Sequence, residues 1–301
     1  MGYSLTADFI DDKAYMIIEE ISSAADGQSN EDLIAIFASE ALTDIVIMDG
    51  GSSVADRAYI DGTIGDAAWF VTSFSRSLKK AIDAEMSQEE SVSSALKEVF
   101  VAFKRKSGGS AIPLYAYPVA AMTWVRVAHI NDIITLQIYC IGDCKTLLLR
   151  PDKSVIDLDP YVNPQELILQ SAIAKLSSDG VADSLARRER LLPMLRARRE
   201  FMNSTASPPA LCLDPCGPFD ARTYTVGVEQ GSTLLAMTDG FYRLVDSYKI
   251  CSNDELADMC SRNGLALALK RLRDFEAAVP GSAALSVKSA DDASAVTCMF
   301  S

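Results

Sequence analysis

The chain has 301 residues, 49% of them hydrophobic, and a formal net charge of −13. This hydrophobic content is enough for a folded core and excludes a disordered chain, while the acidic balance excludes a general affinity for nucleic acid. No apolar run approaches the ~20 residues of a membrane span. The N-terminus lacks a basic region followed by an apolar stretch, so we expect no secretory signal and a cytoplasmic location.

The seven cysteines include no CxxC pair, and their odd number favours a reducing compartment over a disulfide framework. Two CxxxC spacings occur, at Cys140/Cys144 and Cys212/Cys216, but the chain has a single histidine to complete a zinc set. Small buried hydrophobic residues are therefore the better interpretation of these cysteines.

In the first part of the chain, β-type runs precede two helices. The helix predicted over 65–84 rests on apolar side chains at helical spacing, and a second covers 90–104 before Gly108-Gly109 ends it. The β-type runs lie at 14–21, 32–37 and 44–48.

The remainder repeats this order around a segment of different composition. Strands are predicted at 120–128, 133–141, 146–150, 223–228, 233–237 and 293–300, and a helical segment at 253–278. Residues from about 160 to 218 are predicted to be largely helical and rich in arginine. Because the strands form two groups without regular βαβ alternation, the pattern favours a layered α+β domain over a doubly wound sheet.

Acidic residues mark the predicted strand ends. Each Asp-Gly pair alone is typical of a turn. Together they suggest carboxylates pointing into one cleft, where hard cations such as Mg²⁺ and Mn²⁺ prefer oxygen ligands and glycine lets a backbone carbonyl approach. Such ions would also offset the acidic surface, which otherwise repels a phosphorylated substrate. The acidic positions are Glu31-Asp32, Asp49-Gly50, Asp143, Asp239-Gly240 and Asp291-Asp292.

These motifs, in this order, resemble those of the PP2C (PPM) serine/threonine phosphatases, in a divergent form of the bacterial type. The resemblance covers about residues 1–301 and rests on five stretches: Asn30-Glu31-Asp32, Asp49-Gly50-Gly51, Ile141-Gly142-Asp143, Met237-Thr238-Asp239-Gly240-Phe241 and Asp291-Asp292-Ala293-Ser294. It implies one domain over 1–301, a four-layer α-β-β-α sandwich with two central antiparallel sheets, and a variable flap at about 160–218.

The resemblance also implies a metal site with two Mn²⁺ or Mg²⁺ ions per chain and room for a third. Asp49 would bridge both ions, and Gly50 would contribute its carbonyl oxygen. Asp239 and Asp291 would ligate one ion, with Asp292 behind them. Water molecules on the metals would be held by Glu31 and Asp32, and Asp143 would help to hold the third ion.

Two positions depart from the family pattern. Gly27 stands where many members carry a phosphate-binding arginine, and Gly51 stands where eukaryotic members carry a histidine that protonates the leaving group. The single histidine, His129, is far in sequence from every motif, so a structural role is the better interpretation.

Two candidates for a replacement phosphate anchor remain open. Arg57 follows Asp49-Gly50 closely, but a solvated loop arginine is the default interpretation. The other candidate is a group of six arginines. Its default interpretation is a solvated helix face, and the alternative hypothesis is that it attracts an anionic phosphoprotein. This group consists of Arg187, Arg188, Arg190, Arg196, Arg198 and Arg199.

The sequence thus favours a phosphatase in which metal-activated water attacks a phosphoserine or phosphothreonine ester, with Asp49 and Asp239 acting through the ions. The expected partner is a phosphorylated protein, and the oligomeric state stays open. A pseudophosphatase or regulatory binding module with the same fold is the alternative, favoured by the two departures. A calcium-binding domain is disfavoured because no EF-hand spacing occurs.

Overall fold

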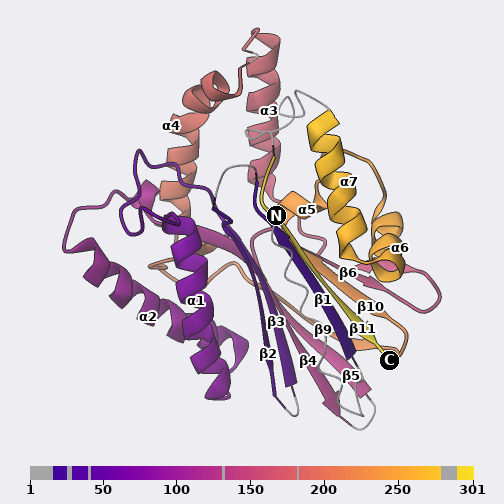
Figure 1. The fold of residues 1–301 in the computed structure, drawn as a ribbon. Coiled ribbons are helices and arrows are strands. Elements are labelled where there is room, and N and C mark those ends of the chain that lie inside the picture. The colour runs from indigo at the N-terminus through magenta and orange to yellow at the C-terminus, as the bar shows by residue number, and fades with distance from the viewer. Residues whose placement is uncertain (1–15, 26–28, 40–41, 131–132, 182, 279–289) are drawn as a thin grey trace.

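A computed structural model describes residues 16–25, 29–39, 42–130, 133–181, 183–278 and 290–301. Gly27 and the start of the strand predicted at 14–21 lie outside this range. Two antiparallel sheets face each other between helices (Figure 1). The predicted four-layer α-β-β-α sandwich is therefore confirmed.

The first sheet has the strand order β1-β11-β10-β6-β7. These strands are β1 (Met16–Ser23), β11 (Ala293–Phe300), β10 (Thr233–Met237), β6 (Lys145–Leu149) and β7 (Val155–Asp157). The second sheet has the order β2-β3-β4-β5-β9, and β8 pairs with β4 off this path. Its strands are β2 (Asp32–Ala38), β3 (Leu42–Gly50), β4 (Val119–Ile130), β5 (Ile133–Ile141), β9 (Arg222–Val228) and β8 (Leu211–Cys212).

Helices cover the outer face of each sheet (Figure 1). On the second sheet lie α1 (Asp66–Asp83) and α2 (Gln88–Ser107), and on the first sheet α6 (Asn253–Asn263) and α7 (Leu265–Ala278). Between β7 and β8 the chain forms α3 (Pro164–Ser178) and α4 (Ser184–Met202), which project from one end of the sandwich. A short helix α5 (Asp239–Tyr242) follows β10, and a 3₁₀ turn η1 (Leu114–Ala116) precedes β4.

Three apolar layers hold these elements together. Trp124 and Phe74 lie in the layer between the second sheet and α1/α2, Ile47 and Leu234 lie between the two sheets, and Phe241 lies between the first sheet and α6/α7. All five side chains are fully buried. Because the central strands β3 and β10 are buried on both faces, the packing fixes the positions of their ends.

The helical segment predicted over 253–278 is confirmed, but it is divided into two helices, α6 and α7. Gly264 has a positive φ of 80° and separates α6 from α7. The backbone N–H of Leu265, at the start of α7, donates to Glu19 Oε1 at 3.1 Å. The short strands β7 and β8 were not predicted, because two or three residues are too few to show a periodic pattern. Among the described residues, none of the helices is long and apolar enough to cross a membrane.

Candidate metal-binding site

Strand register brings the predicted acids together at one end of the sandwich. Asp32 at the start of β2 lies opposite Asp49 near the end of β3. The Gly50 N–H donates to the Glu31 carbonyl at 3.1 Å. The Thr238 hydroxyl, which follows β10 in the other sheet, donates to Asp32 Oδ2 at 2.9 Å. The acids therefore converge from both sheets, although they are scattered along the sequence.

Asp49 and Asp239 form the centre of this cluster. Their carboxyl groups hydrogen-bond each other, and burial raises the pKa of Asp49 well above its ordinary value, with further contributions from Asp239 and Asp32. Burial also raises the pKa of Asp239 to about 7, assisted by Asp291 and Asp143. The two carboxylates therefore repel each other, and the Arg243 guanidinium offsets only part of the charge on Asp239.

Asp32 belongs to the same electrostatic unit. Its side chain is buried, and burial raises its pKa to about 8. Hydrogen bonds with Ser294 and Thr238 oppose this rise, whereas the charges of Asp292 and Asp239 add to it. An excess of mutually repelling carboxylates in a buried position is an arrangement that binds cations.

The two acids before β11 have different partners. Asp292 is buried, and its carboxylate accepts the N–H groups of Ala25 at 2.7 Å and Glu31 at 2.6 Å, so it anchors the segments around β2. Asp291 Oδ2 accepts a hydrogen bond from Arg243 at 2.7 Å. Asp292 thus has a structural role, and assignment of Asp291 as a direct ligand stays a prediction.

Gly240 allows the start of α5 to approach this segment. A Cβ atom at residue 240 would lie 1.9 Å from the carbonyl oxygen of Asp292. Any side chain there would push Asp239 away from the residues before β11. The Asp239-Gly240 pair is therefore required by close packing at the site and is not simply a turn signal.

Glu31 and Asp143 each hydrogen-bond a residue outside the acidic motifs. Glu31 Oε2 accepts the Ser52 hydroxyl at 2.6 Å. Asp143, in the turn after β5, accepts the Asn163 amide at 2.7 Å, and Asn163 caps the N-terminus of α3. Each of these two acids is thus tied to a segment that borders the site: the loop after β3 and the start of α3.

The donor set fits a hard divalent cation. Within the described ranges, no three His, Cys, Asp or Glu side chains are arranged to hold an ion. The pKa shifts nevertheless place six aspartates in one electrostatic neighbourhood: Asp32, Asp49, Asp143, Asp239, Asp291 and Asp292. The Asp49–Asp239 hydrogen bond and the Asp291–Arg243 ion pair engage three of these carboxyl groups. All the candidate ligands are oxygens, as Mg²⁺ and Mn²⁺ require.

Arg243 was not singled out from the sequence. It lies four residues after Asp239, just beyond α5, and is buried. Although burial alone would lower its pKa, the charges of Asp291 and Asp239 raise it. The signal for it was a basic residue two positions after the Thr-Asp-Gly-Phe motif, at one helical turn from Asp239.

Two other residues considered from the sequence lie apart from the acids. His129 is near the far end of β4, whereas Ala121 on the same strand pairs with Asp49, so strand geometry separates them by roughly 25 Å. Arg57 is exposed, and its guanidinium stacks on Tyr59 at 4.8 Å from the ring centroid. No described hydrogen bond or ion pair joins Arg57 to the acids.

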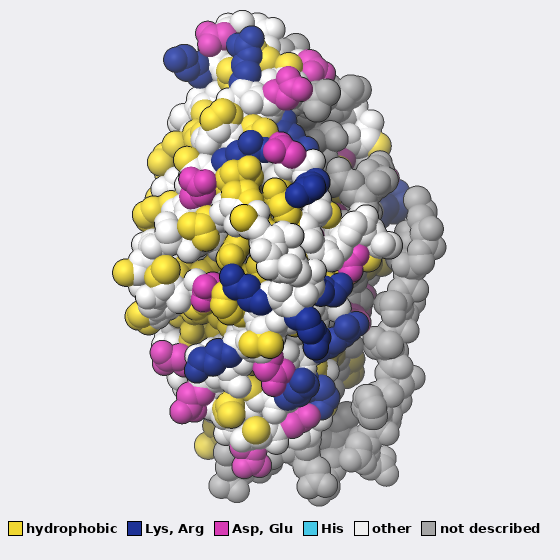
Figure 2. Space-filling model, turned by 90° about the vertical axis from the view of Figure 1, so that its left-hand side faces the viewer, with side chains coloured by type: hydrophobic (Ala, Val, Ile, Leu, Met, Phe, Trp, Pro, Cys, Tyr) yellow, Lys and Arg dark blue, Asp and Glu magenta, His cyan; other side chains and the backbone are white. Residues whose placement is uncertain are grey.

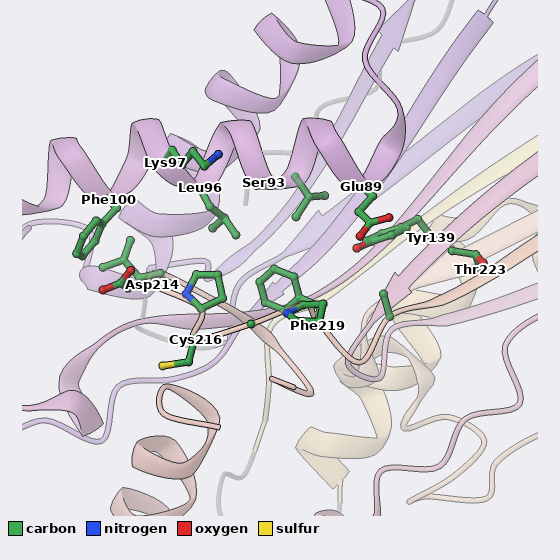
Figure 3. A pocket seen from close by; sticks show the side chains of 16 residues that line it. Glu89, Ser93, Leu96, Lys97, Phe100, Tyr139, Asp214, Cys216, Phe219 and Thr223 are labelled. Atoms are coloured by element: carbon green, nitrogen blue, oxygen red, sulfur yellow. The ribbon is translucent and has the colours of Figure 1, made fainter. Parts of the chain in front are cut away.

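A separate pocket of about 560 Å³ lies between α2 and residues 213–223 (Figure 3). Phe100, Phe219 and Tyr139 contribute to its walls, and Lys97 and Asp214 lie at its sides. None of the predicted metal ligands lines it. The pocket lacks converging acids, so we place the chemistry at the strand ends.

Comparisons with known proteins agree on the fold. No family model matches the sequence, and no curated protein matches it. The serine/threonine phosphatase of S. agalactiae is 15% identical over 95% of this chain and all of its own, with a TM-score of 0.52. The PP2C phosphatase domain and regulatory fragment of SpoIIE from Bacillus subtilis is 11% identical, covering 95% of this chain and 63% of that one, with a TM-score of 0.51.

A third similar structure is the catalytic domain of the phosphatase PstP in complex with two manganese ions. It is 15% identical over 94% of this chain and 97% of its own, with a TM-score of 0.50. The chain has the fold of the bacterial PP2C (PPM) serine/threonine phosphatases.

Proposed function

We propose that the chain is a metal-dependent phosphatase that hydrolyses phosphoserine and phosphothreonine esters. The observation that carries this proposal is the cluster of mutually repelling carboxyl groups around Asp49 and Asp239 on a phosphatase fold. Acids with raised pKa values that outnumber the cationic side chains near them are typical of functional sites.

Asp49, the Gly50 carbonyl, Asp239 and Asp291 are the residues that would hold two Mn²⁺ or Mg²⁺ ions. Glu31 and Asp32 would orient water at their edge, and Asp143 would help with a third ion. Divalent ions bound here would supply a water of lowered pKa and polarise the phosphate ester. The protein's own part is to hold both carboxylates at the ends of β3 and β10.

The test is hydrolysis of p-nitrophenyl phosphate and of a phosphothreonine peptide with Mn²⁺ or Mg²⁺. Asp239→Asn should abolish turnover and weaken ion binding in titration calorimetry. Asp254→Asn, an equal change of charge at an exposed position on α6, should leave both unchanged. Equal activity in the two variants would refute the proposal.

A pseudophosphatase or regulatory binding module is the second candidate. The ion pair of Arg243 with Asp291 favours it, because a resident guanidinium neutralises a carboxylate that a metal would need. Absence of turnover with every divalent metal, together with retained tight binding of a phosphoprotein, would select this function.

A further inference from the structure

The long helix α4 lies against the loop that follows Asp49-Gly50. Arg188, Arg196 and Arg199 donate to three successive backbone carbonyls in residues 52–54, at 3.0, 2.9 and 3.1 Å. Asn203 fastens the end of α4 by donating to the Leu114 carbonyl at 3.2 Å. Three arginines of α4 are therefore fixed against the loop that follows Asp49-Gly50, whereas Arg190 stays exposed.

Arg199 occupies the space beside Gly51. A Cβ atom at residue 51 would lie 3.0 Å from Arg199 Nη2, so a side chain at that position would displace the guanidinium. Arg199 is only 9% exposed. Burial lowers its pKa to about 10, although the nearby Glu31 charge opposes this, and the group stays protonated at neutral pH.

Arg198 lies next to Arg199 and has an unused hydrogen-bond donor. Its Nε atom is buried and has no hydrogen-bond partner among the described residues. Its charge acts on Glu166 and Tyr161, and the charge of Asp143 acts on the same two side chains. The charge of Arg198 therefore acts in the same neighbourhood as that of Asp143, and it also acts on Arg199. A buried, unsatisfied guanidinium N–H at the edge of a site is suited to a ligand oxygen.

We propose that Arg198 and Arg199 form the phosphoryl-binding half of the site and hold the dianion of a phosphate monoester. The inference rests on the proposed function and names the residues that replace the arginine missing at position 27. Guanidinium groups bind phosphate oxygens through paired, charge-assisted hydrogen bonds. Two adjacent guanidiniums also reverse the local field of a chain whose net charge is −13.

The test measures binding of inorganic phosphate to the full-length protein in Mn²⁺ by titration calorimetry. Arg198→Gln should weaken phosphate binding about tenfold or more, because a charge-assisted contact is lost. Arg199→Lys retains the charge but loses the planar fork, and should weaken binding by a smaller factor. With p-nitrophenyl phosphate, Arg198→Gln should raise KM more than it lowers kcat.

Arg190→Gln is the matched control, because Arg190 is an exposed arginine on the same helix. This control matters because Lys and Arg side chains are spread over the face that includes α1, α2 and α4 (Figure 2), and a general cationic surface would also attract phosphate. Arg57→Gln tests the other arginine considered. Both substitutions should leave phosphate binding unchanged.

Several outcomes would overturn the proposal: no phosphate binding by the unsubstituted protein, equal binding by Arg198→Gln, or an equal loss in Arg190→Gln or Arg57→Gln. A parallel loss of Mn²⁺ affinity in Arg198→Gln would also overturn it, since the effect would then arise at the metal. Phosphate binding needs no turnover. If binding depends on Arg198 but no ester is hydrolysed, the anion site stands and the proposed phosphatase function fails.

Discussion

Two aspartates on the same strand, five residues apart, have opposite surroundings. Asp44, near the start of β3, is buried and accepts hydrogen bonds from Trp124 Nε1 at 2.6 Å and Arg126 Nε at 2.7 Å. Asp49, near the end of β3, faces Asp32 and Asp239 instead. Trp124 and Arg126 compensate the charge of Asp44, whereas Asp49 is surrounded by other carboxyl groups. Burial of an acid therefore says little about function until its partners are known.

Asp159 extends the comparison to the pKa. Burial alone would raise the pKa of Asp159, but hydrogen bonds and charge from Arg222 lower it below its ordinary value. Burial and neighbouring acids instead raise the pKa of Asp239 to about 7. A paired buried acid strengthens the fold in its ionised form, whereas the site acids need protons or cations.

The largest effect is expected for Asp49→Asn. Loss of a carboxylate that holds the metals should lower phosphatase activity roughly 10³-fold or more. The melting temperature of the metal-free protein should not fall, because an amide relieves the repulsion with Asp32 and Asp239. Steady-state assays with Mn²⁺ and thermal denaturation check both results. A large drop in metal-free stability with activity retained would contradict the functional role of Asp49.

Asp44→Ala should behave in the opposite way. It leaves Arg126 without its buried ion-pair partner, and removal of one partner from a buried pair lowers the free energy of unfolding by about 3–5 kcal/mol. The kcat of the fraction that stays folded should be close to that of the unsubstituted protein. Urea denaturation and assays at low temperature measure the two quantities. Unchanged stability would show that the ion pair of Asp44 with Arg126 does not stabilise the fold, and would contradict the contrast with Asp49.

The stability of the metal-free protein should decrease as the pH rises from about 4 to about 8. Asp239 and Asp32 have folded-state pKa values of about 7 and about 8, so in this window the folded state holds more protons than the unfolded state. The loss should be on the order of a few kcal/mol. Melting temperatures across this pH range should show it, and Mn²⁺ should restore the most stability at the upper end. A flat profile, or one unchanged in Asp32→Asn, would contradict the pKa shifts.

Arg243→Gln should give the smallest effect. Removal of the guanidinium frees Asp291 and should tighten Mn²⁺ binding about tenfold, because a competing cation is lost. Calorimetric titration measures this change. Arg262→Gln is the control, since Arg262 pairs with Asp258 at 2.9 Å on the surface. Weaker Mn²⁺ binding in Arg243→Gln would mean that this arginine supports the site instead of competing for it.

The sequence by itself determined the elements and the acids. Period-2 runs and Asp-Gly signals located the main strands and their ends, and the order of the motifs pointed to the two-sheet sandwich. Local patterns suffice for these features because strand periodicity and turn chemistry depend on neighbouring residues. The same signals did not separate α6 from α7. The start of α7 after Gly264 is held by a hydrogen bond from the Leu265 N–H to Glu19, which is distant in sequence.

Only the tertiary structure decided which charged side chains lie close enough to compensate one another. The Asp49–Asp239 contact, the pairing of Arg243 with Asp291 and the position of Arg199 beside Gly51 each join residues from different elements. Charge interactions depend on distance and burial, and neither is encoded in local sequence. The arginine group on α4 could therefore be noticed in the sequence, but its location at the edge of the acidic site could not.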